Sequence, residues 1–292
     1  MKGKIIKIVS GTYSVKDAES NTIHTVKPKG IFRYHSLEPK VGDDVDFNET
    51  TILKMYDRKN TFVRPKVSNV DYVILIMSSK SPNFDLDLLD RFLLNIERNY
   101  VKPIIVITKC DLLVEKEFDT IKSFMSYYER YYHVFYSDIN GLKKKEELFS
   151  LLKGKVSILS GQTGAGKSHL LNTIFPELSL ETQEISKALG RGKHTTRETT
   201  LYDIDGMYIA DSPGFSSLDF SDIESERLKD YYPEFRAHLN ECKYNECLHL
   251  SEPNCKIKEL VNSGDILVSR YETYKKIYTE IKQAKKVYGR KY

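Results

Sequence analysis

Two short strings stand in an order that restricts the folds open to this chain. Residues 161–168 read GQTGAGKS and fit the phosphate-binding pattern G-x-x-x-x-G-K-S. About fifty residues earlier, residues 108–111 read TKCD, a T/N-K-x-D string of the kind that selects guanine. An ordinary guanine-nucleotide fold has the phosphate loop first. The reversed order predicts an α/β GTPase domain of the P-loop class whose chain is circularly permuted.

The phosphate-binding string has the context that its chemistry needs. Its glycines let successive backbone N–H groups point at phosphate oxygens, and residues 156–160 before it (VSILS) read as a buried strand. Lys167 supplies a charge for the β- and γ-phosphates, the Ser168 hydroxyl is suited to Mg²⁺, and a helix is expected to begin at His169. We assign nucleotide binding to Gly161, Gln162, Thr163, Gly164, Ala165, Gly166, Lys167, Ser168 and His169.

The second string carries the residue that would read the base. The Asp111 carboxylate can accept hydrogen bonds from N1–H and the amino group of guanine, whereas adenine offers no matching pair of donors. The stem of Lys109 can lie over the ring. The string follows the apolar run 101–107, so it is expected at the carboxyl end of a strand, although a solvated loop would read the same way in isolation. The residues assigned here are Thr108, Lys109, Cys110 and Asp111.

Two further strings predict the parts that sense the γ-phosphate. Residues 211–214 read DSPG, in which Asp211 would hold Mg²⁺ through water and the Gly214 N–H would meet the γ-phosphate. Residues 192–196 read GKHTT, and either Thr195 or Thr196 would cap Mg²⁺. Phe215 stands where many GTPases carry the glutamine that orients water. His194 is our candidate for that role, and a loop histidine that contacts RNA or solvent is the alternative.

With these motifs, the chain closely resembles the RsgA (YjeQ/YloQ) family of circularly permuted GTPases that depend on the small ribosomal subunit. The resemblance runs nearly end to end and includes Arg64-Pro65, Asn69-Val70-Asp71 and the string LLDRFL at 88–93. Two departures are Thr108, where many GTPases have asparagine and gain an amide contact, and Ser137-Asp138, a loose fit to the backbone-donor loop. The resemblance implies late-stage assembly of the small subunit, contact with rRNA, and turnover stimulated by that subunit.

The sequence predicts three domains. Residues 1–63 contain short strands near 4–9, 12–15, 22–26, 41–45 and 51–55, which suit an OB-type β-barrel that binds RNA or serves as a structural cap. Lysines with Phe32 and Tyr34 could supply charges and stacking rings. Residues 64–218 form the GTPase domain, with strands near 72–77, 102–107, 134–137, 156–160 and 206–210.

Residues 219–292 predict a helical module built around a metal. Cys242, Cys247, His249 and Cys255 are spaced C-x4-C-x-H-x5-C, a set suited to one structural Zn²⁺, although reduced cysteines beside a stray histidine are the alternative. The tail from Arg270 carries eight Lys or Arg against two Glu, interleaved with tyrosines. This predicts a basic helix that either contacts rRNA or packs its tyrosines on the metal module.

Composition fits a multi-domain protein, since 40% of its 292 residues are hydrophobic and the net charge is only +4. No apolar run approaches the ~20 residues of a membrane span, and MKGKIIKIVSG lacks signal-peptide features. We expect a cytoplasmic monomer that binds GTP and GDP, the small subunit and rRNA, but no membrane. A GTPase acting on a protein partner, and a nucleotide-gated RNA-binding module with incidental hydrolysis, remain alternatives.

Overall fold

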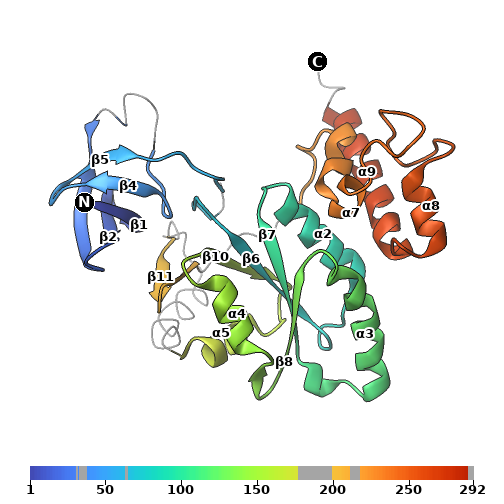
Figure 1. Ribbon diagram of the computed structural model, residues 1–292, viewed down its shortest axis with the longest axis horizontal. Coiled ribbons are helices and arrows are strands. Elements are labelled where there is room, and N and C mark those ends of the chain that lie inside the picture. The colour runs from blue at the N-terminus through green and yellow to red at the C-terminus, as the bar shows by residue number, and fades with distance from the viewer. Residues whose placement is uncertain (31, 33–37, 63–64, 177–198, 211–217, 289–292) are drawn as a thin grey trace.

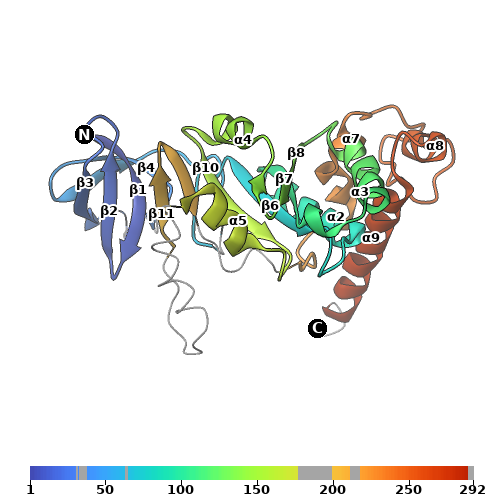
Figure 2. The same cartoon turned by 90° about the horizontal axis from the view of Figure 1, so that it is seen from below.

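The computed structural model describes residues 1–292 except 31, 33–37, 63–64, 177–198, 211–217 and 289–292, and the side chains of 286–288. Its three parts lie in a row: an N-terminal barrel, a central sheet covered by helices, and a C-terminal group of helices (Figures 1 and 2). In the part of the chain that is described, no helix is both long and apolar enough to cross a membrane.

The N-terminal barrel closes in the strand order β1-β2-β3-β5-β4. Its strands are β1 Lys2–Val9, β2 Thr12–Asp17, β3 Ile23–Pro28, β4 Asp44–Phe47 and β5 Thr51–Met55. Alternate residues point inward, as in β2, where Tyr13 and Val15 are buried with Phe47 and Ile52 from the facing strands. The predicted OB-type barrel is confirmed, since the five strands close on themselves through a short parallel pairing of β3 with β5.

A segment between barrel and sheet fixes β6 (Tyr72–Ser78), the first strand of the central sheet in the chain, in register with its neighbour. The Asp71 N–H donates to Val156 O at 2.8 Å, and its carboxylate accepts from the Val156 N–H at 3.0 Å. Asn69 donates its side-chain amide to Gly42 O in the barrel at 3.0 Å. The Asn-Val-Asp string therefore joins the two parts through its polar side chains.

The central sheet has seven strands in the order β11-β12-β10-β6-β7-β8-β9. The strands from β12 to β8 are parallel, and the two edge strands are antiparallel. The five predicted strands are present, whereas β9 and β11 were not expected. Their bounds are β6 Tyr72–Ser78, β7 Lys102–Thr108, β8 His133–Asp138, β9 Gly141–Leu142, β10 Val156–Gly161, β11 Leu201–Ile204 and β12 Met207–Ala210.

Helices cover both faces of this sheet. Successive residues of β6 point to opposite faces, so Val73 and Leu75 belong to one hydrophobic cluster and Ile74 and Ile76 to another. The first cluster is closed by α2 (Leu86–Glu97) and α3 (Glu115–Tyr128), and the second by α4 (Lys145–Leu152) and α5 (Lys167–Ile174). The predicted α/β domain with helices on both faces is confirmed.

The C-terminal helices pack against α2 across a buried ionic cluster. They are η2 (Ser225–Tyr231), α7 (Pro233–Arg236), α8 (Lys256–Ser263) and α9 (Val268–Tyr288). Arg270 of α9 is 1% exposed and lies 2.9 Å from Asp90 of α2 and 2.6 Å from Glu234 of α7. The Tyr128 hydroxyl donates to Asp90 at 2.6 Å. This cluster joins the C-terminal module to the central part of the molecule through α2 and α3.

Candidate nucleotide site and metal centre

The loops of the candidate nucleotide site leave the sheet at the carboxyl ends of three neighbouring strands, β10, β6 and β7. The phosphate loop follows β10, the base-reading loop follows β7, and β6 lies between those two strands. Carboxyl ends of parallel strands are where open α/β sheets bind ligands. The permuted sheet therefore brings 108–111 beside 161–168 although the two strings are reversed in sequence.

The phosphate loop turns sharply over β6. Gly161 has φ +133°, and a Cβ at this position would lie 2.0 Å from Ile76 O, so a side chain cannot be accommodated there. The Gln162 N–H donates to Ile76 O at 3.1 Å. Gly166, in the left-handed region at φ 81°, begins α5. Three of the glycines thus have positive φ, and the helix starts at Lys167, two residues before the predicted His169.

The polar side chains of the loop lie at its surface. The ammonium group of Lys167 donates to the carbonyl oxygens of Gly161 at 3.0 Å and Gln162 at 2.9 Å. Ser168 and His169 are exposed in the first turn of α5. These positions leave the Ser168 hydroxyl accessible, as a Mg²⁺ ligand must be, and put the positive end of the helix at the loop.

Thr108 ties the base-reading loop to the phosphate loop. Its hydroxyl is 2.6 Å from Ala165 O and 3.2 Å from Met77 O, and the residue is 4% exposed. Many GTPases have asparagine at this position, and we expected threonine to lose the contact of its amide. The Thr108 hydroxyl makes a contact in its place. Thr108 lies below the site surface and holds two loops together.

Lys109 spans the same two loops from above. Its backbone is left-handed at φ 59°, and its ammonium group donates to Gly164 O at 2.8 Å and to Ser81 O. Asp111 follows in the short helix η1 (Cys110–Leu112) and is exposed, which leaves its carboxylate free to accept from a base. Between them, burial raises the pKa of the Cys110 thiol to about 11, so this thiol remains protonated at neutral pH.

The turn after β8 is the candidate backbone-donor loop. The Asp138 carboxylate accepts from the Asn140 N–H at 2.8 Å, and the Ser137 hydroxyl donates to Gly141 O at 3.1 Å. Both side chains are thus engaged in shaping a tight β8–β9 hairpin. Any contact that this loop makes with a base would come from its backbone.

The predicted γ-phosphate sensors lie outside the described residues. These are His194, Thr195 and Thr196, together with Asp211, Gly214 and Phe215. The hairpin of β11 and β12 follows the first group and precedes the second. Strand β1 contacts this hairpin through a bridge between Lys7 and Thr200, and Lys16 of β2 forms an ion pair with Asp203. The barrel therefore touches the strand pair between the two predicted sensors.

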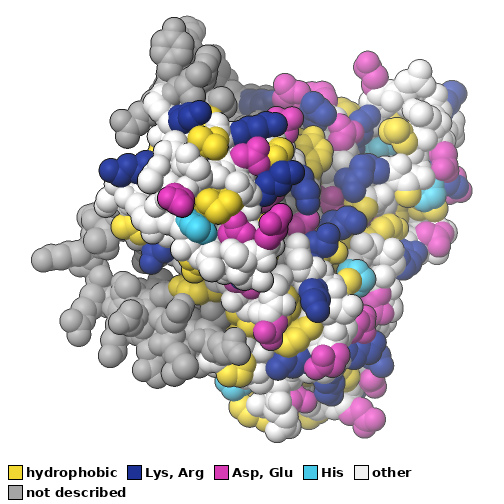
Figure 3. Space-filling model, turned by 60° about the vertical axis from the view of Figure 1, so that its left-hand side comes forward, with side chains coloured by type: hydrophobic (Ala, Val, Ile, Leu, Met, Phe, Trp, Pro, Cys, Tyr) yellow, Lys and Arg dark blue, Asp and Glu magenta, His cyan; other side chains and the backbone are white. Residues whose placement is uncertain are grey.

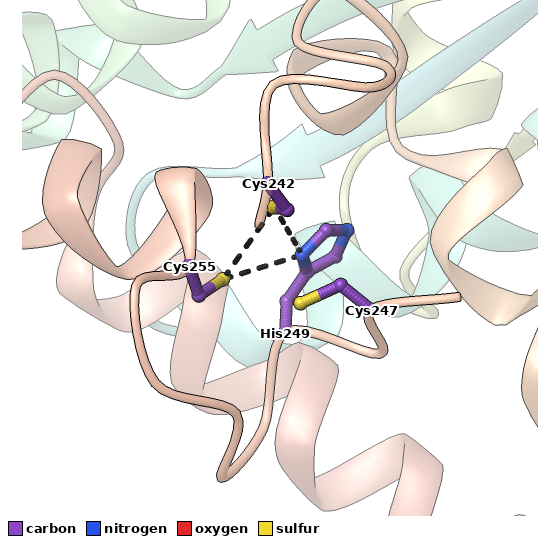
Figure 4. A group of neighbouring side chains, drawn as sticks. All are labelled: Cys242, Cys247, His249 and Cys255. Carbon is purple, nitrogen blue, oxygen red and sulfur yellow. Dashed lines mark hydrogen bonds between the residues drawn. The ribbon is translucent and has the colours of Figure 1, made fainter. Parts of the chain in front are cut away.

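The C-terminal cysteines and histidine converge on one point (Figure 4). Their candidate ligand atoms all lie within 4.8 Å of one another. His249 Nδ1 lies 3.5 Å from the Cys242 Sγ and 3.3 Å from the Cys255 Sγ, and the two sulfurs are 3.9 Å apart. A tetrahedral zinc ion with bonds of ~2.0–2.3 Å separates its ligands by roughly 3.3–3.8 Å, which is close to the three distances among Cys242, His249 and Cys255, so the group fits such an ion.

The protonation of the cluster also suits a metal. Burial, with a smaller effect of Lys229, lowers the pKa of His249 to about 4, which keeps the ring neutral and able to ligate. Burial raises the pKa of the Cys247 thiol to about 12, so a bound cation is needed to stabilise the thiolate. The hydroxyls of Tyr271 and Tyr274 donate to His249 O and Leu248 O, each at 2.6 Å. For these two tyrosines, the structure favours packing on the metal module over RNA contact.

The barrel surface corrects one expectation about stacking. Phe32 is 8% exposed and packs in the barrel core, so it cannot stack on a base, and Tyr34 lies outside the described residues. The described part of the face turned forward in Figure 3 mixes Lys and Arg with Asp and Glu. The exposed lysines of the barrel include Lys2, Lys7, Lys27 and Lys29.

Comparison with known proteins gives matches over nearly the whole chain. The family model RsgA GTPase matches residues 55–221, and the model RsgA N-terminal domain matches residues 2–52. The small ribosomal subunit biogenesis GTPase RsgA of Bacillus cereus (strain ATCC 10987 / NRS 248) is 45% identical over 98% of this chain and 99% of its own. That of Leuconostoc citreum (strain KM20) is 43% identical over 98% and 97%.

Two solved structures are similar in fold. One is described as the crystal structure of YloQ, a circularly permuted GTPase, with a TM-score of 0.83 and 36% identity over 97% of this chain and 95% of that chain. The other is YjeQ from Thermotoga maritima, with a TM-score of 0.84 and 34% identity over 96% and 98%. Both the permuted order and the resemblance drawn from the motifs are confirmed.

Proposed function

Because this chain belongs to the RsgA family of circularly permuted GTPases, we propose that its GTP hydrolysis serves the assembly of the small ribosomal subunit. The relatives that share its whole length are named for this role. The observation that carries the assignment of the site is the meeting of two strings at one sheet edge, where Thr108 bonds to Ala165 and Lys109 to Gly164.

In this proposal, different residues at the carboxyl ends of these strands bind different parts of the nucleotide. Asp111 accepts from the guanine edge, and the stem of Lys109 covers the ring. Backbone N–H groups of residues 161–166 and the Lys167 ammonium bind the phosphates. The Ser168 hydroxyl would hold Mg²⁺, which would neutralise charge on the β- and γ-phosphates. With a nucleotide present, the Lys167 ammonium leaves its two carbonyl partners for phosphate oxygens.

The hydrolytic step is assigned to residues on either side of the β11–β12 hairpin. Thr195 or Thr196 and Asp211 would hold Mg²⁺, and the Gly214 N–H would meet the γ-phosphate. A phenyl ring at Phe215 cannot orient water, so His194 takes that role. His194→Ala should abolish subunit-stimulated turnover while GTP affinity and subunit binding persist. Near-normal turnover would assign water positioning elsewhere.

The metal centre is proposed to bind one structural zinc ion. All four ligands come from the chain, and the cluster is largely buried, so no position is left for a substrate. Its role is to hold the loops of residues 242–255 against α9. The module and the barrel are proposed to contact rRNA of the small subunit, from a cytoplasmic monomer.

Sedimentation with ribosomes tests the proposed partner. In the presence of a non-hydrolysable GTP analogue, the protein should migrate with small subunits, and small subunits should raise its GTP turnover. A protein-only partner would give no comigration. Comigration without any change in turnover would instead indicate an RNA-binding module that is gated by nucleotide.

A further inference from the structure

The loop that follows β6 belongs to none of the strings assigned to nucleotide binding, yet it contacts two of them. Because β6 lies between β10 and β7, residues 79–84 leave the sheet between the phosphate loop and the base-reading loop. A Cβ on Gly164 would lie 3.5 Å from Pro82 Cδ, which places this loop against the phosphate loop. Ser81 O accepts from the Lys109 ammonium group, which also donates to Gly164 O.

Ser79 holds the backbone at the start of the base-reading loop. Its N–H donates to Thr108 O at 3.0 Å, and its hydroxyl donates to Lys109 O at 2.9 Å. One residue thus binds two successive carbonyl groups on either side of the Lys109 Cα. Ser79 is 5% exposed, so water cannot readily replace the hydroxyl.

The backbone that Ser79 holds is one that a lysine rarely adopts. Lys109 has φ 59° and ψ 32°, in the left-handed region that disfavours residues with a Cβ. The Leu112 N–H also donates to Lys109 O, at 3.1 Å, so the carbonyl has two donors. Two donors thus hold this carbonyl, while the Lys109 side chain extends to Ser81 O and Gly164 O.

We propose that Ser79 is a positioning residue of the nucleotide site, which holds Lys109 in the left-handed conformation that lets its side chain lie between base and phosphate loop. The proposal rests on the proposed assignment of Lys109 to the nucleotide. Ser79 itself touches no nucleotide atom in this scheme. It acts on affinity for the guanine half of the ligand, which GTP and GDP share.

The neighbouring serine supplies a matched control. Ser78 is fully buried, and its hydroxyl donates to Lys80 O at 2.8 Å within the same loop. Among the described residues, the Ser78 side chain forms no hydrogen bond with 108–111, so Ser78→Ala removes a hydroxyl of equal size and similar burial without releasing Lys109.

The test measures GDP and GTP affinity of the full chain by titration calorimetry, with steady-state turnover alongside. Ser79→Ala should raise both dissociation constants by the same factor, about 3- to 10-fold, as expected for one neutral hydrogen bond. KM should rise by the same factor, because slow chemistry makes KM report binding. The kcat value should stay within about twofold of that of the parent. Ser78→Ala should leave both constants near those of the parent, and Ser79→Thr, which keeps the hydroxyl, should restore affinity.

A double-mutant cycle with Lys109→Ala separates positioning from general loop stability. In that background Ser79→Ala should have little further effect, because the side chain to be placed is gone. An equal loss in both backgrounds, an equal loss with Ser78→Ala, or no loss at all would overturn the proposal.

The outcome with Lys109→Ala alone separates this inference from the site assignment. If Lys109→Ala weakens GTP binding and Ser79→Ala does not, only the role of Ser79 fails. If neither variant changes affinity, the assignment of Lys109 fails with it. Urea unfolding of each variant checks folding, and Ser79→Cys, which keeps the size but weakens the donor, replaces a Ser79→Ala protein that does not fold.

Discussion

Arg270 and Asp90 form an ion pair of 2.9 Å in which neither side chain is more than 1% exposed. The pair joins the C-terminal helix α9 to α2, the helix that follows the Ser79 loop. A charge left alone at such depth is costly, because the buried partner keeps its desolvation penalty. The strength of this connection therefore depends on both members being present.

Arg270→Ala is expected to lower the free energy of unfolding by about 3–5 kcal/mol, because Asp90 and Glu234 would be left buried without a cation. Arg91→Ala is the control. Arg91 forms a bidentate ion pair with Glu280, whose side chain is half exposed. Arg91→Ala should therefore lower the free energy of unfolding by at most about 1 kcal/mol. Urea denaturation measures the free energy of unfolding of both variants. Equal losses in the two variants would contradict the role of Arg270 as the buried cation between α2 and α9.

Asp90 should also give this interface a pH dependence. Burial raises the pKa of Asp90 to about 6, against the opposing effects of Arg270 and Tyr128, whereas an unfolded aspartate titrates near ~3.9. Between pH ~3.9 and pH about 6 the folded state therefore binds more protons than the unfolded state. The contribution of protonated Asp90 to stability is fully present below pH ~3.9 and is lost as the pH rises through about 6. The stability of Asp90→Asn, measured from pH 4 to 7, should lack this decline. Parallel profiles for the two proteins would contradict it.

Asp111→Asn should exchange guanine preference for xanthine. The new amide can donate to the xanthine carbonyl that replaces the guanine amino group, and GTP should lose about 10- to 100-fold in affinity, as for hydrogen bonds to a charged group. Competition titrations with GTP and xanthosine triphosphate measure the ratio. Asp119→Asn, exposed on α3, serves as a control that should leave it unchanged. Unaltered GTP affinity in Asp111→Asn would remove this residue from the site.

Gly161→Ala should disable the phosphate loop. The added Cβ would meet Ile76 O at 2.0 Å, so the loop must move away from β6, and the φ of +133° would be strained in addition. We expect GTP affinity to fall by at least about 10-fold. Gly30→Ala, which adds a methyl group in open space, should retain it. Normal GTP binding by Gly161→Ala would contradict the loop geometry.

Cys247→Ser should release the metal and loosen the C-terminal module before it affects nucleotide binding. Cys247 is 2% exposed and belongs to the ligand cluster, whereas Cys110 lies in the base-reading loop, so Cys110→Ser is the matched control. Elemental analysis should find one zinc per chain in the parent and the control but not in Cys247→Ser. Absence of zinc from carefully purified parent protein would refute the proposal.

The parts that the sequence predicted are those whose signal is local. Each of these signals lies within a short stretch of sequence, so it can be recognised without knowledge of the fold. They are the glycines of the phosphate loop, the apolar run before Thr108 and the spacing of the four metal ligands. The barrel was legible for the same reason, since its short strands alternate and end at turn residues.

The parts that were missed depend on contacts between distant segments. Thr108 reaches Ala165 only because β6 brings β7 and β10 within one strand of each other. Arg270 reads as one more cation of a basic helix until Asp90 and Glu234 are placed around it. Phe32 reads as a surface ring because it lies among turn and basic residues, and only closure of the barrel shows that it is buried.

The position of β10 in the sheet dictates an order of assembly during synthesis. Strand β6 has six buried residues in seven, and one of its two edges pairs with β10, which emerges from the ribosome long after it. Until then that edge is an unpaired apolar strand, open to wrong partners and to chaperones. The base-reading half of the pocket is made first and the phosphate loop closes the gap. A nascent chain of this family can therefore bind guanine nucleotide only after β10 has covered the apolar edge of β6, which makes nucleotide binding a sign that these two strands have paired.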